Sequence, residues 1–161
     1  MLGDVERGCP MLLSPNFSLA EFTVSDTAER IGDANLPTPA HLANLRITAA
    51  GFETARHILG DCAIVLTSGY RNAHVNRAVK GVKTSAHTLG FAGDFHAAGI
   101  PPLSVARQLA AAMRAGRIKF DQLILESSRN ICHLSFDPRL RCEVKTQAAA
   151  AGTSVVFGLP D

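Results

Sequence analysis

The sequence predicts an α+β domain, in which helices and a sheet are built from separate parts of the chain. An amphipathic helical pattern occupies residues 38–60, a β-branched apolar run covers residues 63–67, and two further apolar runs flank a four-residue polar turn after residue 126. The chain has 161 residues, of which 47% are hydrophobic. This length supports one domain with a core, so we expect a single domain over residues 1–161.

Four helices are predicted. In the longest, Thr38 is the N-cap, Pro39 lies in the first turn, apolar residues recur on one face and Gly60 ends the helix. The other three are a short helix from about Leu19 after a Ser18–Glu21 capping box, a helix from Asn72 to Val79, and a helix from about Leu103 to Ala115.

The strands are predicted from short apolar runs bounded by turn residues. Residues 63–67 have the pattern of a buried strand, and residues 94–96 follow a glycine-rich turn. Residues 120–126 and 131–136 are predicted to form an antiparallel hairpin. Residues 141–146 and 154–157 are candidate edge strands around an alanine-rich loop.

Composition excludes several classes of function. The 16 basic and 14 acidic residues are spread along the chain with no basic run, and the chain has one Tyr and no Trp, so we expect no nucleic-acid partner. No stretch of about 18 apolar residues predicts a membrane span. The first 15 residues lack the order of a signal peptide, which predicts a protein that is cytoplasmic as synthesised. The four cysteines form no C-x-x-C pair, and we expect free thiols in a reducing compartment.

His87, Asp94 and His133 are the candidate metal ligands. The first two are separated by six residues that include glycines, so both side chains can face one point if Asp94 begins a strand. His133 lies in the second strand of the predicted hairpin. Two histidines and a carboxylate leave the fourth position of a zinc ion open to water, which is typical of a catalytic site and not of a structural one. Such a zinc makes water a nucleophile near neutral pH.

The sequence around these residues resembles a known family. Residues 68–71 read S-G-Y-R, and residues 85–94 match S-x-H-x-x-G-x-A-x-D, the signature of the zinc D-alanyl-D-alanine carboxypeptidases. The similarity extends from residues 14–22 through 120–124 to the H-L-S-F segment at 133–136, and so covers most of the chain. These enzymes cleave peptidoglycan stem peptides, and the family includes phage endolysins.

The resemblance implies zinc on His87, Asp94 and His133, and a Hedgehog/DD-peptidase-like fold with a small central antiparallel sheet and helices packed on one side. It implies a peptidase acting on peptidoglycan stem peptides, either as a D-Ala-D-Ala carboxypeptidase or as an L-Ala-D-Glu type endopeptidase. We expect a monomer. A phage lysis system is one route by which such a protein, made without a signal peptide, would reach the cell wall.

Arg71 and Ser85 are the candidate substrate-binding residues. The resemblance places Arg71 beside the metal, where a guanidinium can hold a carboxylate through two parallel hydrogen bonds. The alternative for Arg71 is a salt bridge that fixes its loop. Ser85 either orients the substrate or caps the turn before His87, and the sequence does not separate these two roles.

The general base is the point at which this sequence departs from the family. Many relatives carry an acidic residue three positions before the last histidine, where this chain has Asn130, and an amide cannot accept a proton from water. Glu126 is the best substitute, because pairing with Ile131 in the hairpin would put it on the same sheet face as His133 and diagonal to it. A slip of one residue would put Glu126 on the opposite face. Asp121 and Asp137 are lesser candidates, with a capping or turn role as the alternative.

The remaining candidates are weaker. His96 could share a face with Asp94, either supporting the metal site or lying on the sheet surface. Cys132 alternates with His133 and should point away from the metal. The other histidines, His41, His57 and His74, have no supporting context. Two functions are therefore carried forward: a zinc peptidase in which Glu126 and Arg71 are catalytic, and a zinc-stabilised domain that binds the cell wall without cleaving it.

Overall fold

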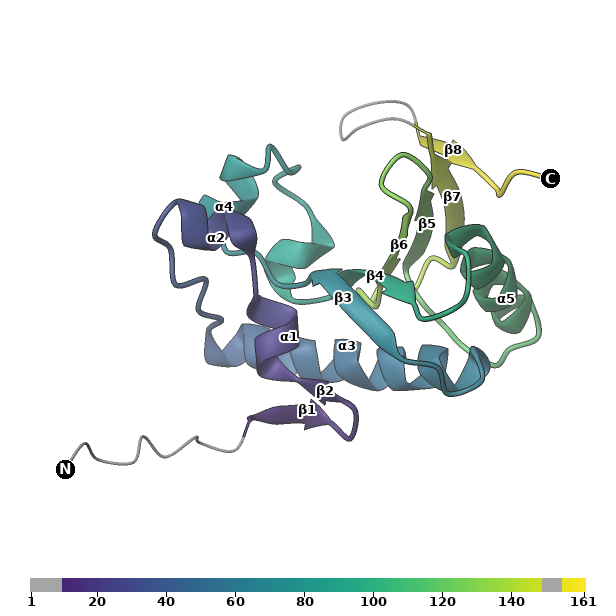
Figure 1. Cartoon of the computed structure of the whole chain (residues 1–161), viewed down its shortest axis with the longest axis horizontal. Helices are drawn as coiled ribbons and strands as arrows, with labels where there is room; N and C mark the ends of the chain where they lie inside the picture. The colour runs from purple at the N-terminus through teal and green to yellow at the C-terminus, as the bar shows by residue number, and fades with distance from the viewer. Residues whose placement is uncertain (1–9, 149–154) are drawn as a thin grey trace.

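A computed structural model of the protein describes residues 10–148 and 155–161. The fold is α+β, as the sequence predicts (Figure 1). The helices are α1 (Leu19–Thr23), α2 (Asp26–Arg30), α3 (Pro39–Ile58), α4 (Ala73–Ala78), the 3₁₀ helix η1 (Ala86–Leu89) and α5 (Pro102–Arg114). The strands are β1 (Leu12–Ser14), β2 (Phe17–Ser18), β3 (Ile64–Ser68), β4 (Ala92–Ala97), β5 (Gln122–Glu126), β6 (Ile131–Ser135), β7 (Glu143–Gln147) and β8 (Val155–Phe157).

The main sheet has six strands in the order β3-β4-β6-β5-β7-β8. The β5–β6 hairpin is present in the predicted register, with Glu126 opposite Ile131. The sheet is antiparallel except between β5 and β7, which run parallel. Neighbouring strands that run parallel need a crossover, and here the chain returns along β6 and residues 136–142 before it enters β7. β7 is therefore an inner strand and not the edge strand predicted from residues 141–146, whereas β8 is an edge strand, as predicted for residues 154–157.

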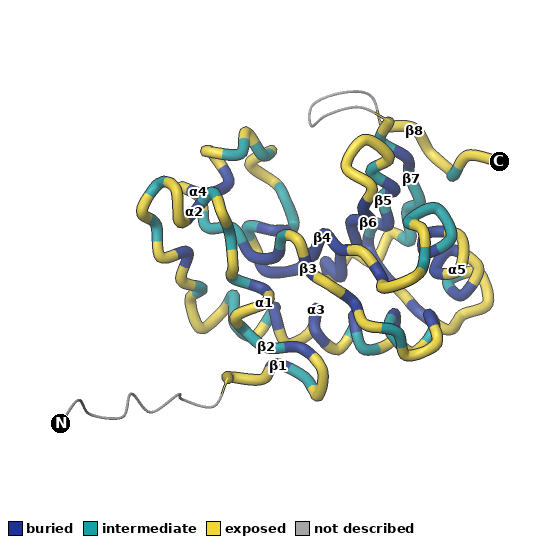
Figure 2. Tube along the Cα trace, in the orientation of Figure 1, coloured by how far each residue is buried: buried dark blue, intermediate teal, exposed yellow. Residues whose placement is uncertain are grey.

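One face of the sheet packs against α3 and α5 and forms the core. Phe95 on β4, Leu134 on β6 and Leu123 on β5 are fully buried on this face, together with Phe52 of α3 and Leu109 of α5. Figure 2 shows the buried segments concentrated where the sheet meets these helices. Because side chains alternate along a strand, the residues next to these core positions face the other way. They include Asp94 and His133, so the second face carries the candidate site.

The strand predicted from residues 63–67 is an edge strand and not a fully buried one. β3 pairs with β4 alone in the main sheet, and its exposure alternates, with Val65 and Thr67 exposed and Ile64 and Leu66 turned to the core. A run of apolar residues does not by itself show whether one face of a strand is buried or both faces are. Thr67 therefore lies on the open face of the sheet, where its hydroxyl donates to the carbonyl oxygen of Asp94 on β4.

Helix boundaries follow the predicted capping residues. Ser18 and Glu21 form a capping box before α1, Thr38 caps α3, and the Asn72 side chain accepts a hydrogen bond from Val75 N at the start of α4. The sequence did not predict the β1–β2 hairpin, α2 or η1. Glu53 of α3 helps to hold the β1–β2 hairpin, because it accepts hydrogen bonds from Ser14 and Asn16.

The described cysteines are free, in agreement with the expectation. Cys132 is buried, and Cys62 and Cys142 are partly buried. Cys9 lies outside the described residues. Within residues 10–148 and 155–161, none of the helices combines the length and the apolar character needed to cross a membrane.

Candidate metal centre

His87, Asp94 and His133 come together on the open face of the sheet. Asp94 and His133 are opposite each other on β4 and β6, and His87 approaches from η1, which precedes β4. All three residues are buried, with exposures of 2%, 2% and 8%. His87 and His133 are 46 residues apart in the sequence. The pairing of β4 with β6 and the position of η1 together bring the three side chains to one point.

The three side chains offer one ligand atom each in a tight triangle. His87 Nε2 lies 3.1 Å from Asp94 Oδ1 and 3.2 Å from His133 Nδ1, and His133 Nδ1 lies 2.9 Å from Asp94 Oδ1. A tetrahedral zinc bound at 2.0–2.1 Å separates its ligand atoms by about 3.3 Å. The triangle is therefore close to the size that zinc requires, and this group could hold a metal ion. Two imidazoles and one carboxylate are also a donor set that suits zinc.

Backbone contacts orient His87. Its Nδ1 lies 2.7 Å from the carbonyl oxygen of Gly69, which fixes the proton on Nδ1 and leaves the lone pair of Nε2 facing the other ligand atoms. In the other direction, Arg71 N donates to the carbonyl oxygen of His87 at 3.2 Å. The S-G-Y-R segment and the histidine segment thus hold each other through two hydrogen bonds, which gives a physical reason for their joint occurrence in the sequence.

Gly69 occupies a position where a side chain has no space. A Cβ at this residue would collide with the backbone of Phe22, whose carbonyl oxygen accepts a hydrogen bond from Tyr70 N at 2.6 Å. The close approach of these two backbones places the Gly69 carbonyl under His87. Glycine at this position therefore contributes to the orientation of a candidate ligand.

The protonation states favour metal binding. Burial lowers the pKa of His87, although the charge of Asp94 opposes the shift, so the imidazole is neutral near pH 7. Burial raises the pKa of Asp94, but interactions with His87 and His133 outweigh it and hold this pKa well below its ordinary value. A neutral imidazole and an ionised carboxylate are the forms that bind zinc.

The three ligand residues line a cleft of about 570 Å³. Its floor is the open face of β5, with Gln122, Ile124 and Glu126, and one wall is the loop of residues 79–86. That loop is held by Asn76, whose side-chain amide donates to the carbonyl oxygens of Gly81 and Val82. The volume lies within the range of small-molecule and peptide sites.

Glu126 lies on the same sheet face as His133. Ile124 is directly opposite His133, so Glu126, two residues further along β5, is diagonal to it, as the sequence predicted. Glu126 lines the cleft and pairs with Arg129 at 3.0 Å.

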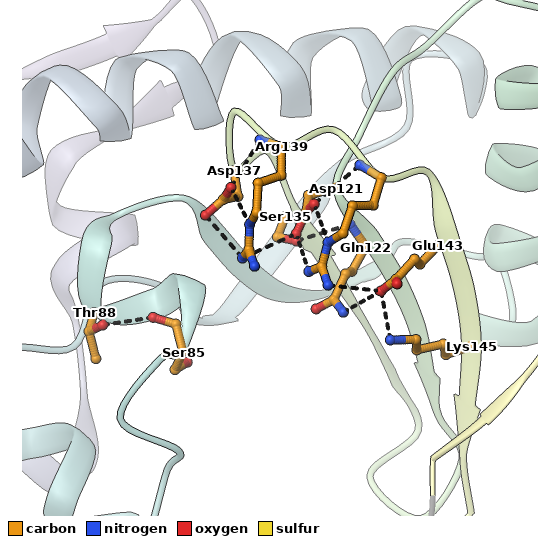
Figure 3. Close-up of polar contacts among 10 residues, drawn as sticks. Ser85, Thr88, Asp121, Gln122, Ser135, Asp137, Arg139, Glu143 and Lys145 are labelled. Atoms are coloured by element: carbon orange, nitrogen blue, oxygen red, sulfur yellow. Dashed lines mark hydrogen bonds and ion pairs between the residues drawn. The ribbon is translucent and has the colours of Figure 1, made fainter.

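Asp121 and Asp137 are engaged elsewhere. Arg141 donates to both oxygens of Asp121, at 2.8 and 2.7 Å, and Arg139 binds both oxygens of Asp137, at 2.8 and 3.2 Å. Hydrogen bonds from these arginines lower the pKa of both carboxyl groups. The two pairs join Glu143 and Lys145 in what we call the arginine–carboxylate cluster (Asp121, Asp137, Arg139, Arg141, Glu143 and Lys145), most of which Figure 3 shows. Their carboxylates have structural partners, which makes them poor candidates for a base.

Arg71 and Ser85 both line the cleft. Arg71 has no ion pair with any described residue, and its Nε is buried without a hydrogen-bond partner. The predicted alternative, a salt bridge that fixes the loop, is therefore not present in the part of the chain that the structure describes. Ser85 precedes η1 but its side chain makes no capping hydrogen bond there, and its carbonyl oxygen accepts from Thr88 Oγ1 at 2.7 Å (Figure 3).

The other histidines and Cys132 lie outside the ligand group. His96 is exposed on β4 and lines a different cleft. His41 contacts the Tyr70 hydroxyl, and His57 and His74 pair with Asp61 and Asp33, respectively.

Cys132 faces away from the metal ligands, as expected. Its thiol lies 3.3 Å from the carbonyl oxygen of Pro102, on the α5 side of the sheet. Burial raises its pKa to about 12, so the thiolate that would bind a metal does not form at neutral pH.

Sequence reasoning missed Arg129. Its Nη1 lies 3.0 Å from Glu126 Oε2 and 3.4 Å from Asp94 Oδ2, so it contacts both carboxylates of the cleft. In the sequence this arginine is one residue of a polar turn, and the only available signal was its position three residues after Glu126.

Comparison with protein families decides the relationship. The family model described as Peptidase M15 matches residues 15–135. The chain belongs to the peptidase M15 family. This M15 peptidase is accordingly a hydrolase, and zinc dependence is typical of the family. The match spans all three candidate ligands, and of the arginine–carboxylate cluster it includes Asp121 alone. A search of curated proteins found no match to the chain.

Proposed function

We propose that this M15 peptidase hydrolyses peptide bonds in peptidoglycan stem peptides, with zinc held by His87, Asp94 and His133. One observation carries the proposal: three buried ligand atoms within 3.2 Å of one another face a cleft that also contains a carboxylate and an unpaired arginine. Family membership supports a zinc peptidase that acts on the cell wall. A zinc ion in such a site supplies a Lewis acid that polarises the scissile carbonyl and acidifies water.

Glu126 is the proposed general base. It lines the cleft on the sheet face of His133 and diagonal to it, and its ionised form can take the proton of the attacking water. The same group, once protonated, can return the proton to the leaving amine. Arg129 holds one Glu126 oxygen, Oε2, which leaves the other to contact water. Asn130, which stands at the position usual for the acidic residue, lies in the turn with a left-handed backbone (φ +54°).

Arg71 is the proposed substrate-binding cation. Its guanidinium is largely buried at the edge of the cleft, and burial lowers its pKa while Asp94 opposes this shift. A buried guanidinium with an unpartnered Nε gains a strong interaction when a carboxylate binds, because the bond forms away from bulk water. Ser85 also lines the cleft, and its hydroxyl makes no capping hydrogen bond at η1, so we propose that it contacts the peptide backbone. Stem peptides carry free carboxylates, which fits this site.

The decisive experiment is digestion of muropeptides by the zinc-loaded protein, with mass spectrometry of the products. We expect zinc-dependent cleavage that a chelator abolishes, and the product masses distinguish release of a terminal residue from an internal cut. Glu126→Gln should lower kcat by about 10²–10⁴-fold while zinc content is unchanged. The matched control is Glu143→Gln, a carboxylate on the same sheet face that does not line the cleft and should keep kcat within about twofold.

Two results would contradict the proposal. Full activity of Glu126→Gln would remove Glu126 as the base. Metal-dependent binding of muropeptides without cleavage over long incubation would favour the non-catalytic wall-binding domain. An endolysin role is a finer proposal, which requires that the purified protein lyse cells whose outer barrier has been opened.

A further inference from the structure

Arg129 is placed where three hollows of the surface meet. It lines the catalytic cleft, a second cleft of about 340 Å³ beside β3 and α2, and a third of about 460 Å³ near Pro101. Among the described residues it is common to all three, and Arg71 is common to the first two. Both arginines, like Asp94, therefore line the catalytic cleft and also the second cleft, which contains several hydroxyl side chains.

The β5–β6 turn fixes the backbone of Arg129. Arg129 N donates to the carbonyl oxygen of Glu126 at 3.1 Å, and Ser127 N donates to Gln147 O on the neighbouring strand at 3.0 Å. Asn130 closes the turn in the left-handed conformation that asparagine tolerates. The position of the guanidinium is therefore set by the sheet and by its contacts with Glu126 and Asp94.

Much of the hydrogen-bonding capacity of Arg129 is unused. Its contacts with described side chains involve Nη1 alone, although a guanidinium has five N–H donors. The side chain is 49% exposed and lines the cleft. Arg71 is in a similar state, with no ion pair among the described residues.

The charges around this point favour an anion. Asp94 and Glu126 are the carboxylates that line the cleft with these two guanidiniums. Burial lowers the pKa of Arg71, the charge of Asp94 opposes this shift, and the charge of Arg129 lowers the pKa further. When a divalent cation binds to Asp94, this carboxylate no longer offsets the arginines, and the site has an excess of positive charge. A substrate carboxylate at this point would restore the balance.

We infer that Arg71 and Arg129 together bind one carboxylate of the substrate next to the metal, which makes Arg129 a specificity-determining residue. This inference rests on the proposed function. The carboxylate has two possible sources, the C-terminal α-carboxylate of the residue after the scissile bond or a side-branch carboxylate of an internal residue. The chemistry that recognises them is the same, and matched substrates separate them.

The experiment compares four synthetic peptides with the zinc-loaded enzyme. The first pair of peptides ends one residue after the scissile bond, one with a free C-terminal carboxylate and the other with a C-terminal amide. The second pair extends further, one with an internal acidic residue and the other with the amide analogue of that residue. In one of the two pairs, the wild type should prefer the carboxylate. Arg129→Gln should lower kcat/KM for that carboxylate peptide by about 10–100-fold more than for its amide partner, mainly through KM.

Arg139→Gln is the matched control, because Arg139 lines the same cleft but is bound to Asp137. It should leave the carboxylate preference unchanged. Arg129→Lys should lose part of the preference, since an ammonium keeps the charge but not the bidentate geometry.

Three outcomes overturn the inference. If the wild type does not distinguish acid from amide in either pair, the anion site does not exist. If Arg129→Gln lowers kcat equally for both members of a pair, Arg129 orients Glu126 and does not bind substrate. If the protein cleaves no peptide, the proposed function fails, and calorimetric titration of the zinc-loaded protein with the same acid and amide peptides still tests the anion site. Equal binding of acid and amide would then reject it.

Discussion

Two groups of charged and polar side chains, each built around a buried aspartate, differ in how their charges are matched. In the candidate metal centre, His87, Asp94 and His133 each offer one potential ligand atom, and these three atoms lie within 3.2 Å of one another. In the arginine–carboxylate cluster, Asp121 is 1% exposed and receives two hydrogen bonds from the side chain of Arg141. The first group could hold a cation from outside the chain, and the carboxylates of the second already have cationic partners within the chain.

The comparison shows why one buried aspartate is a candidate ligand and another is not. Both carboxyl groups have a lowered pKa and little exposure, so neither property separates them. The difference lies in the neighbours. Asp121 is surrounded by guanidinium donors that cannot lose their protons, whereas Asp94 Oδ1 is next to two imidazole nitrogens that can. A carboxylate between neutralisable donors is the one that a metal can use.

Loss of one candidate ligand should produce the largest effect. His133→Ala should reduce bound zinc to background and activity to the level of the chelated wild type, because a site with two protein ligands does not retain zinc against a chelator. Asp121→Asn is the control from the other group and should keep one zinc. Zinc content by mass spectrometry and muropeptide cleavage give the readouts. Retention of zinc by His133→Ala would exclude it as a ligand.

Asp121→Asn should instead lower stability. Removing the buried charged partner of Arg141, which then keeps only Glu143 at 3.4 Å, should reduce the free energy of unfolding by about 2–3 kcal/mol at pH 7, measured by urea denaturation. The pKa of Asp121 is lowered in the folded state from an ordinary value of 3.8, so its stabilising effect is present above this pH and is lost as the pH falls through the lowered value. The difference between wild type and variant should therefore shrink below about pH 4. A difference that stays constant to lower pH would contradict this role.

Gly69→Ala tests the support of the metal centre. The added methyl group would collide with the backbone of Phe22 and displace the carbonyl that orients His87. We expect zinc affinity to fall by about 10–100-fold, as when other partners of metal-binding histidines are removed. Competition with a zinc-binding dye measures this change. Unchanged affinity in a folded variant would show that His87 is oriented without this hydrogen bond.

Glu143→Gln should have the smallest effect of the four. Glu143 pairs with Lys145 at 2.6 Å, but its side chain is 22% exposed and partly screened by water. We expect a loss of about 0.5–1 kcal/mol in the free energy of unfolding. A loss as large as that of Asp121→Asn would mean that the cluster acts as one cooperative network, which a double variant at both positions would reveal as non-additivity.

Local sequence signals predicted a large part of the fold. The Ser18–Glu21 capping box, the Thr38 cap and the β5–β6 hairpin depend on interactions over a few residues, so they can be inferred from the chain. The parallel β5–β7 pair could not, because it joins segments that an intervening strand separates. The exposed face of β3 was missed for a related reason, since exposure depends on which strands lie alongside.

For the candidate site, the sequence by itself determined the residue types and the family, through S-G-Y-R and the segment from Ser85 to Asp94, and it placed Glu126 on the correct face. Only the tertiary structure decided that His87, Asp94 and His133 form one triangle, that Asp121 and Asp137 have arginine partners, and that Arg129 joins Glu126 to Asp94. The physical reason is that a side chain's role depends on its neighbours in space. Motifs report which groups are present, and strand register and loop packing determine which of them meet.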